Sequence, residues 1–135
     1  IAPGAEVLSG QAIDADLRAM RFPLNGEAVA RSGETLFVGA SYLWGGVTPW
    51  GCDCSGFVQR VYALHGVRLP RDAWQQASKG HSITSDPTAD HEPGDLLFFS
   101  DRDDARITHV GLALGAGRMV HSSLMRGGIA IEQLL

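Results

Sequence analysis

The stretch Asp53-Cys-Ser-Gly-Phe-Val-Gln-Arg-Val-Tyr-Ala-Leu64 predicts a helix that buries one apolar face. The residues at the i, i+3 and i+4 spacing of such a face are Phe57, Val58, Val61, Tyr62 and Leu64. Asp53 or Ser55 can cap the helix, because either side chain can accept a hydrogen bond from a free backbone N–H of the first turn. His65-Gly66 is typical of a helix end.

The segments on either side of this helix predict the fold class. Upstream, apolar residues at helical spacing from Val29 to Ala40 predict a helix between Gly26 and about Ser41. Downstream, a short helix is expected after Leu69, with Pro70 near its first turn and Asp72 as a candidate cap. Strand periodicity then follows in four segments: Leu96–Phe99, Ile107–Leu114, Arg118–Ser122 and Ile129–Leu134. Helices followed by antiparallel strands indicate an α+β fold.

Residues 1–26 differ from the rest of the chain. They are too few to fold alone, and they predict either a strand and turn left from a preceding module, with Val7 to Leu17 as its last strand and exit, or an arm packed on the main domain. The start carries neither an initiator Met nor a signal segment, so we expect a piece of a longer polypeptide. The main domain is predicted over residues 27–135.

Composition excludes several classes of function. A chain of 135 residues is the size of one domain, and we expect a monomer. The formal net charge is −4 and no basic run exceeds two residues, which argues against a nucleic acid partner. No apolar stretch approaches the roughly 18–20 residues of a membrane span. No phosphate-binding or dinucleotide glycine pattern is present, and we predict no cofactor.

The two cysteines, Cys52 and Cys54, differ in their predicted roles. A disulfide between them would close a very small, strained ring. Cys54 falls in the first turn of a helix, where free N–H groups and the helix dipole favour a thiolate, so it is the candidate nucleophile. Cys52 has no assigned role beyond packing. The glycine- and aromatic-rich loop from Tyr42 to Gly51 precedes both, and Trp44 is expected at the rim of a binding pocket there.

The two histidines of the predicted hairpin are expected on one face. A three-residue turn at Gly115-Ala-Gly117 pairs Leu114 with Arg118 and Leu112 with Val120, and Gly111 with His121. His109 then lies diagonal to His121, and Gly111 leaves room between them. An imidazole that orients a second imidazole supplies the base and the orienting group of a catalytic triad with Cys54. Zinc binding by these two histidines and the two cysteines is the alternative, although their spacing does not fit common structural zinc sites.

These residues resemble those of the NlpC-type cell-wall peptidases. The motifs occur in the family's order over about residues 30–135: Tyr42-Leu-Trp-Gly-Gly, Asp53-Cys-Ser-Gly-Phe57, Leu69-Pro-Arg-Asp72, Pro93-Gly-Asp-Leu-Leu-Phe98, His109-Val-Gly and Val120-His-Ser122. The resemblance implies a papain-like α+β fold, with N-terminal helices packed on an antiparallel sheet. It also implies a Cys-His-His triad of Cys54, His109 and His121 that cleaves the γ-D-glutamyl–diamino acid bond of murein peptides.

The first and third motifs are similar to those of a subgroup that recognises a free N-terminal L-Ala and carries preceding bacterial SH3-like modules. By this resemblance Tyr42 supports the nucleophile. The residues implied to line the substrate site are Asp53, Ser55, Arg71 and Asp72. Caps at Asp53 and Asp72 and an ion pair at Arg71 are the structural alternatives. A non-catalytic murein-binding module and an amidase remain alternative functions, and the protein could act in the cell envelope or in cytoplasmic murein recycling.

Overall fold

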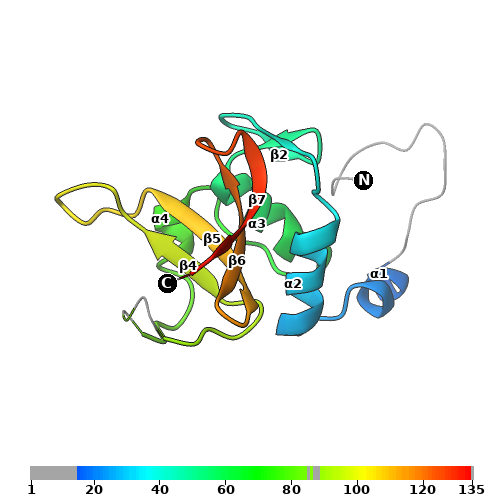
Figure 1. Ribbon diagram of the computed structural model, residues 1–135. Helices are drawn as coiled ribbons and strands as arrows, with labels where there is room; N and C mark the ends of the chain where they lie inside the picture. The colour runs from blue at the N-terminus through cyan, green and yellow to red at the C-terminus, as the bar shows by residue number, and fades with distance from the viewer. Residues whose placement is uncertain (1–14, 85, 87–88, 135) are drawn as a thin grey trace.

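The computed structural model describes residues 15–84, 86 and 89–134 (Figure 1). Its helices are α1 (Ala15–Arg21), α2 (Gly26–Thr35), α3 (Cys54–Leu64) and α4 (Ala73–Gln76). Its strands are β1 (Ser41–Tyr42), β2 (Val47–Thr48), β3 (Gly51–Cys52), β4 (Leu96–Phe99), β5 (His109–Gly115), β6 (Arg118–Ser123) and β7 (Gly128–Gln133). None of the helices in these ranges has the length and apolar character needed to cross a membrane.

Within the described residues the seven strands form one sheet, in the order β2-β3-β1-β7-β6-β5-β4. The four longer strands were predicted, and they pair as antiparallel neighbours from β4 to β7. β1 and β3, which the sequence did not predict as strands, pair in parallel and extend the predicted antiparallel sheet. Strands of two residues are too short to show an alternating pattern, which is why the sequence predicted a loop there.

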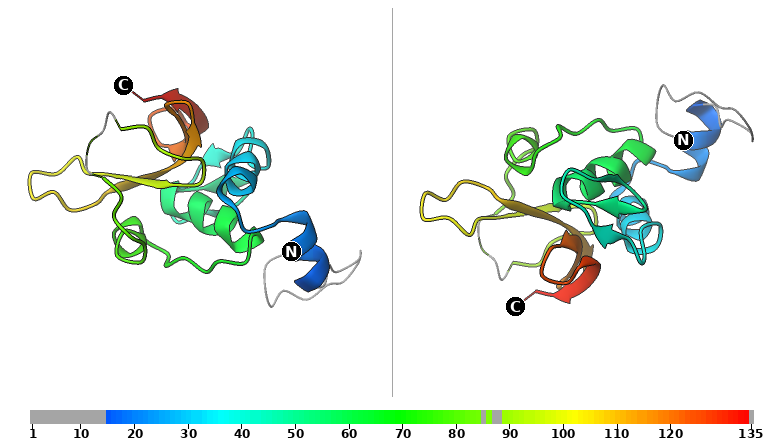
Figure 2. Two further views of the ribbon diagram at one scale, coloured as in Figure 1. Left: turned by 90° about the horizontal axis from the view of Figure 1, so that it is seen from below. Right: turned by 90° about the horizontal axis from the view of Figure 1, so that it is seen from above.

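Helix α3 supplies the centre of the core, as its apolar periodicity predicted. Phe57, Val58 and Val61 are each 0% exposed. Buried strand residues in the same cluster are Cys52, Val110, Leu112 and Val120. Each of these Phe, Val and Leu side chains stabilises the fold by about 1.5–3 kcal/mol through removal from water. α2 lies beside α3, and both pack against β5, so the N-terminal helices cover the sheet (Figure 2). The α+β prediction is confirmed.

The two ends of α3 follow from its flanking residues. Asp53 is the N-cap, and its Oδ1 accepts a hydrogen bond of 2.7 Å from the backbone N–H of Gly56. Ser55 lies inside the first turn and does not cap the helix. His65 ends the helix, and Gly66 follows with φ of +87°, a left-handed conformation that glycine adopts without a steric penalty.

The other helices depart from prediction in detail. α2 ends at Thr35, six residues before the predicted end, because Gly39 turns the chain at φ +82° and Ser41 enters the sheet. Asp72 is the N-cap of α4, as predicted, but Pro70 lies before the first helical turn. There its carbonyl accepts a 2.8 Å hydrogen bond from the Gln76 side chain.

The segment before α2 contains the helix α1, which the sequence did not predict and which begins within the expected exit of the strand. Arg18 of α1 donates a 2.8 Å hydrogen bond to the carbonyl of Leu64 at the end of α3. Phe22 packs edge-on against the ring of His65. These contacts hold residues 15–22 against the main domain, as expected for an N-terminal arm. Residues 1–14, which carry most of the predicted strand, lie outside the described residues.

In the β5–β6 hairpin, His109 and His121 lie on one face of the sheet as predicted, but the turn and the strand register differ from the prediction. Leu112 pairs with Val120 as predicted, but Arg118 pairs with Gly115 rather than with Leu114. The turn is therefore two residues long, and both have positive φ, 53° at Ala116 and 72° at Gly117. A register shift between Ala113 and Gly115 leaves Leu114 outside the pairing as a bulge. The bulge offsets the shorter turn, so residues 109 and 121 stay on one face.

Candidate active site

Cys54 is the first residue of α3 and is half-buried. Burial has the largest effect on its pKa and raises it, and the negative charge of Asp53 raises it further. The backbone N–H groups of Val110, Ser55 and Cys54 act on the sulfur in the opposite direction, but the pKa stays above its ordinary value. The resting group is a neutral thiol. The sequence predicted a lowered pKa from the helix terminus alone and could not account for the burial.

The contact with Val110 places the sulfur of Cys54 beside the strand that carries His109, because His109 directly precedes Val110 on β5. His109 in turn meets His121 on β6. The Nε2 atom of His109 lies 2.7 Å from the Nδ1 atom of His121, and the ring planes are 75° apart. The predicted proximity of the two imidazoles is confirmed. Its basis is hairpin register, which brings residues twelve apart in sequence together.

The pKa of His109 is lowered from 6.5 to about 4, first by burial and then by His121. Burial also lowers the pKa of His121. Both rings are therefore neutral near pH 7. A neutral His109 that hydrogen-bonds through Nε2 keeps Nδ1 for a second partner, as a general base must. The arrangement can accept a proton at one ring nitrogen and be oriented at the other.

Gly111 provides the space predicted between the histidines. A Cβ atom built on Gly111 would lie 3.6 Å from the Cβ of His121 and 2.8 Å from the sulfur of Met119. A side chain at this position would therefore displace the Met119 sulfur and lie in van der Waals contact with His121. The spacing His109-Val-Gly111 thus serves the histidine pair as well as the strand.

Asp53, Ser55 and Arg71 form one polar network at the start of α3. From the described part of the chain, five groups hydrogen-bond to the Asp53 carboxylate: the N–H of Gly45, the N–H of Gly56, the hydroxyl of Ser55 and two N–H groups of Arg71. A carboxylate offers about four lone-pair sites, so these bonds occupy Asp53 fully. The cap and the ion pair named as structural alternatives are both present.

The remaining candidates lie around this network to different degrees. Tyr42 is close enough to Cys54 and Asp53 for their charges to raise its phenol pKa, although burial raises it most. Trp44 is 87% exposed in the turn after β1. Asp72 is exposed and caps α4, and its backbone N–H donates a 3.3 Å bond to Gln75 Oε1. The structure therefore brings Tyr42 close to Cys54 but leaves Trp44 and Asp72 at the surface.

Two supporting residues were not predicted from sequence. Gln76 is 2% exposed, and its Nε2 donates 3.1 and 2.8 Å hydrogen bonds to the carbonyls of Ser55 and Pro70. It thus fixes the residue that follows Cys54. Ser122 donates a 2.7 Å hydrogen bond to the carbonyl of Cys52, which connects β6 to the segment before Cys54. Helix and strand periodicity predict that these residues face the core, but only the tertiary structure shows which groups they hydrogen-bond to.

The zinc alternative finds no support in the geometry. Across residues 15–84, 86 and 89–134, no three His, Cys, Asp or Glu side chains converge as metal ligands. Cys52 is fully buried and packs in the apolar core, the role that the sequence left for it.

Comparison with known proteins places the chain in a family. The model of the NlpC/P60 family matches residues 39–135, which contain Cys54, both histidines and all seven strands of the sheet in the described residues. The chain belongs to the NlpC/P60 family. The resemblance drawn from the six sequence motifs is thereby confirmed.

Individual NlpC/P60 proteins show how far the likeness extends. A γ-D-glutamyl-L-lysine dipeptidyl-peptidase of Bacillus subtilis is 43% identical over 100 residues, 73% of this chain and 32% of the relative. The solved NlpC/p60 domain of the peptidoglycan hydrolase SagA is 32% identical with a TM-score of 0.68, and the match covers 82% of this chain and 90% of that one. RipD of Mycobacterium tuberculosis, described as a non-catalytic NlpC/p60 domain protein, shares the fold at 20% identity, TM-score 0.59 and coverage of 79% and 88%.

The chain spans about a third of the length of the first curated relatives that it matches, 32% and 29%. On this chain the NlpC/P60 match covers residues 39–135. The solved SagA domain, by contrast, is matched over nearly its whole length. The likeness to the longer relatives is therefore a likeness of one domain.

Proposed function

We propose that residues 27–135 form a cysteine peptidase domain that hydrolyses the γ-D-glutamyl–diamino acid bond of murein peptides. The observation that carries the proposal is the 2.7 Å contact between His109 Nε2 and His121 Nδ1, next to the strand residue whose N–H contacts the Cys54 sulfur. The name of the Bacillus subtilis relative supports the choice of bond.

In the proposed reaction Cys54 attacks the γ-glutamyl carbonyl while His109 Nδ1 takes the thiol proton. The carbonyl oxygen becomes an oxyanion, and backbone N–H groups at the start of α3 stabilise its charge. His109 then gives the proton to the departing amine of the diamino acid, which leaves an acyl-enzyme on Cys54. Water attacks this thioester with His109 again as base, and the free acid and the thiol are restored.

The pKa of His109, about 4, leaves the proposed base neutral before attack, so that it can accept a proton. The raised pKa of Cys54 keeps the thiol protonated before attack. Proton transfer to His109 would therefore accompany the attack rather than precede it.

Substrate recognition is the finer part of the proposal. Tyr42 is proposed to support the nucleophile. Asp53, Ser55 and Arg71 are proposed to shape the site for a free N-terminal L-Ala, with Asp53 acting through the network that already occupies its carboxylate. Trp44 and Asp72 are proposed as rim residues, in keeping with their exposure. We propose a monomer that binds murein peptide without a cofactor.

A matched pair of cysteine variants tests the activity. Wild-type protein is incubated with L-Ala-γ-D-Glu-L-Lys and L-Ala-γ-D-Glu-diaminopimelate, each with and without an acetylated N-terminus, and products are identified by mass spectrometry. Cleavage at the γ-glutamyl bond is expected in the wild type and in Cys52→Ala, and none in Cys54→Ala. Turnover by Cys54→Ala would overturn the proposal. Binding of all peptides without turnover by the wild type would favour the non-catalytic alternative, and release of a different fragment would favour an amidase.

A further inference from the structure

His121 has one ring nitrogen engaged and one that lacks a hydrogen bond. Its side chain is 6% exposed, and Nδ1 contacts His109 at 2.7 Å. Nε2 is buried and has no hydrogen-bond partner among the described residues. Buried polar atoms of this kind are uncommon and call for an explanation. The group that faces this atom is the carboxylate of Glu132, whose Oε2 lies 3.7 Å away.

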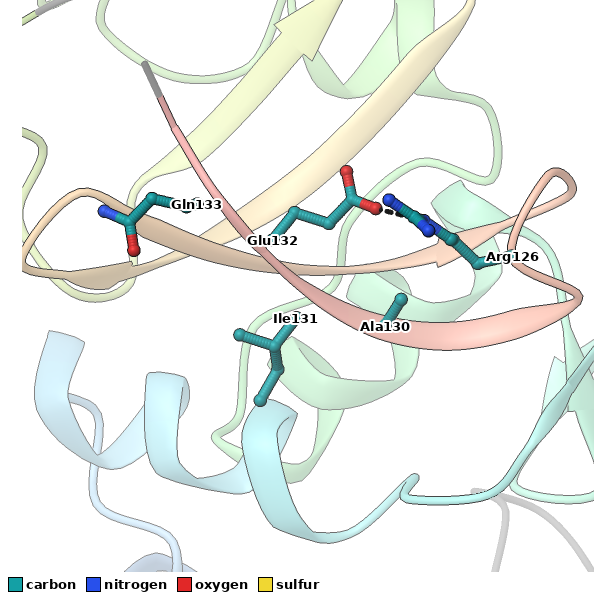
Figure 3. Close-up of a pocket in the computed structure, with 5 residues that line it drawn as sticks. All are labelled: Arg126, Ala130, Ile131, Glu132 and Gln133. Carbon is teal, nitrogen blue, oxygen red and sulfur yellow. Dashed lines mark hydrogen bonds and ion pairs between the residues drawn. The ribbon is translucent and has the colours of Figure 1, made fainter.

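Strand pairing explains why Glu132 lies there. His121 pairs with Ala130 across β6 and β7, and Glu132 is two residues further along β7 on the same face. Figure 3 shows the side chains of Ala130 and Glu132 on one side of β7 and that of Ile131 on the other. His109, His121 and Glu132 thus stand diagonally across three neighbouring strands.

The carboxylate of Glu132 is itself fixed. Arg126, in the turn before β7, donates a 2.6 Å hydrogen bond from Nε to Glu132 Oε1 (Figure 3). The other carboxylate oxygen, Oε2, is the one that faces His121. These residues line an open depression of about 410 Å³ on the outside of β7, and neither Cys54 nor the two histidines line it. The Glu132 carboxylate therefore faces solvent on one side and His121 on the other.

We propose that Glu132 is a positioning residue that selects the Nε2–H tautomer of His121, and through it the Nε2–H tautomer of His109. This proposal rests on the proposed function and deepens it. The separation of 3.7 Å is too long for a direct hydrogen bond, so the carboxylate acts chiefly through its charge. A negative charge opposite Nε2 favours the tautomer whose Nε2 carries the proton.

The consequence passes from ring to ring through the 2.7 Å contact. With the proton on its Nε2, His121 presents a lone pair at Nδ1, which can only accept. His109 must then donate from Nε2, and its Nδ1 carries the lone pair that a base for Cys54 needs. In the other tautomer, Nδ1–H of His121 donates to His109 Nε2, and His109 carries its proton on Nδ1, where it cannot take one from the thiol. One carboxylate outside the triad thus sets the protonation of two rings.

Electrostatics agree with this geometry. The charge of Glu132 raises the pKa of both His121 and His109, against the larger effect of burial. The same charge stabilises the imidazolium that His109 becomes when it accepts the thiol proton. Burial lowers the pKa of His121 most, and Arg126 lowers it further, so the ring stays neutral and accepts from His109 instead of competing for the proton.

The test reads tautomers directly and kinetics separately. Two-bond ¹H–¹⁵N correlation spectra of histidine-labelled protein at pH 7.5 distinguish Nδ1–H from Nε2–H rings. Wild type is compared with Glu132→Gln, which keeps the shape but removes the charge and can donate as well as accept. Glu34→Gln is the matched control. It also removes one carboxylate charge that lies 3.7 Å from its ionic partner, here Arg118. Murein peptide turnover is measured for all three proteins.

We expect Nε2–H tautomers at both histidines in the wild type and in Glu34→Gln, and mixed tautomers in Glu132→Gln. kcat should fall about tenfold or more in Glu132→Gln, as is typical when a residue that orients a functional histidine is lost. KM should stay within about twofold of the wild-type value. An Nδ1–H ring at His121 in the wild type, or unchanged tautomers or kcat in Glu132→Gln, would overturn the role of Glu132. If wild type cleaves no murein peptide, the proposed function fails, and the tautomers of the free protein still decide the inference.

Discussion

Asp53 and Arg71 form a two-pronged ion pair, with Arg71 nitrogens 3.0 and 2.8 Å from the two carboxylate oxygens of Asp53. The same carboxylate caps α3 through the backbone N–H of Gly56. The Arg71 side chain is 34% exposed and the Asp53 side chain 14%, so solvent screens the ion pair only partly. It connects the segment before α4 to the helix that begins with Cys54.

Asp53→Ala should therefore lower the free energy of unfolding more than loss of a helix cap alone. We expect a loss of about 2 kcal/mol, from the missing cap and from an Arg71 left without its partner. Urea denaturation followed by circular dichroism measures it. Asp72→Ala is the matched control, because Asp72 is an exposed N-cap of the four-residue α4, and its loss should be about 0.5 kcal/mol. Equal losses in the two variants would contradict the network.

Stability should fall with pH between 6.5 and 4 because of His109. Its folded pKa, about 4, lies below its unfolded value of 6.5, so the unfolded chain binds the extra proton in this window. The stability is fully present above pH 6.5 and is lost as the pH falls toward 4. We expect a decrease of about 2 kcal/mol between pH 7 and 4.5 in urea unfolding. His109→Gln, which cannot titrate, should lose less over the same range, and an identical loss would contradict the assignment.

The thiol of Cys54 should react slowly at mildly acidic pH. Because its pKa is raised by burial and by Asp53, the thiolate fraction should grow about tenfold per pH unit up to pH 8. Iodoacetamide labelling with peptide mapping measures the rate at Cys54, and the fully buried Cys52 serves as the internal control. A rate that stays level between pH 5 and 8 would instead indicate a thiolate paired with an imidazolium.

The turn between the two histidine strands contains a strained alanine. Ala116 has φ of 53°, a left-handed conformation that costs a residue with a Cβ more than it costs glycine or asparagine. Ala116→Asn should raise the free energy of unfolding by about 0.5–1 kcal/mol without changing activity. Ala113→Gly is the control in the same hairpin, and it should destabilise, because Ala113 is buried inside β5. Destabilisation by Ala116→Asn would show that the turn does not adopt this conformation.

The sequence by itself determined the elements with strong periodicity and clear end signals. α3 begins and ends where Asp53 and His65-Gly66 predicted, and the four longer strands were found, because a buried face imposes a repeat that local sequence displays. The candidate nucleophile and the two histidines were also named from motifs, and the two histidine rings do lie in contact.

Only the tertiary structure decided the features that depend on pairing between distant segments. The bulge at Leu114, the parallel edge formed by β1 and β3, and the raised pKa of Cys54 arise from register and burial, which no local pattern encodes. The position of Glu132 behind His121 is of the same kind, since it exists only once β6 and β7 are aligned. Local sequence sets which way a side chain faces, whereas its partners and its pKa are set by the chain folded around it.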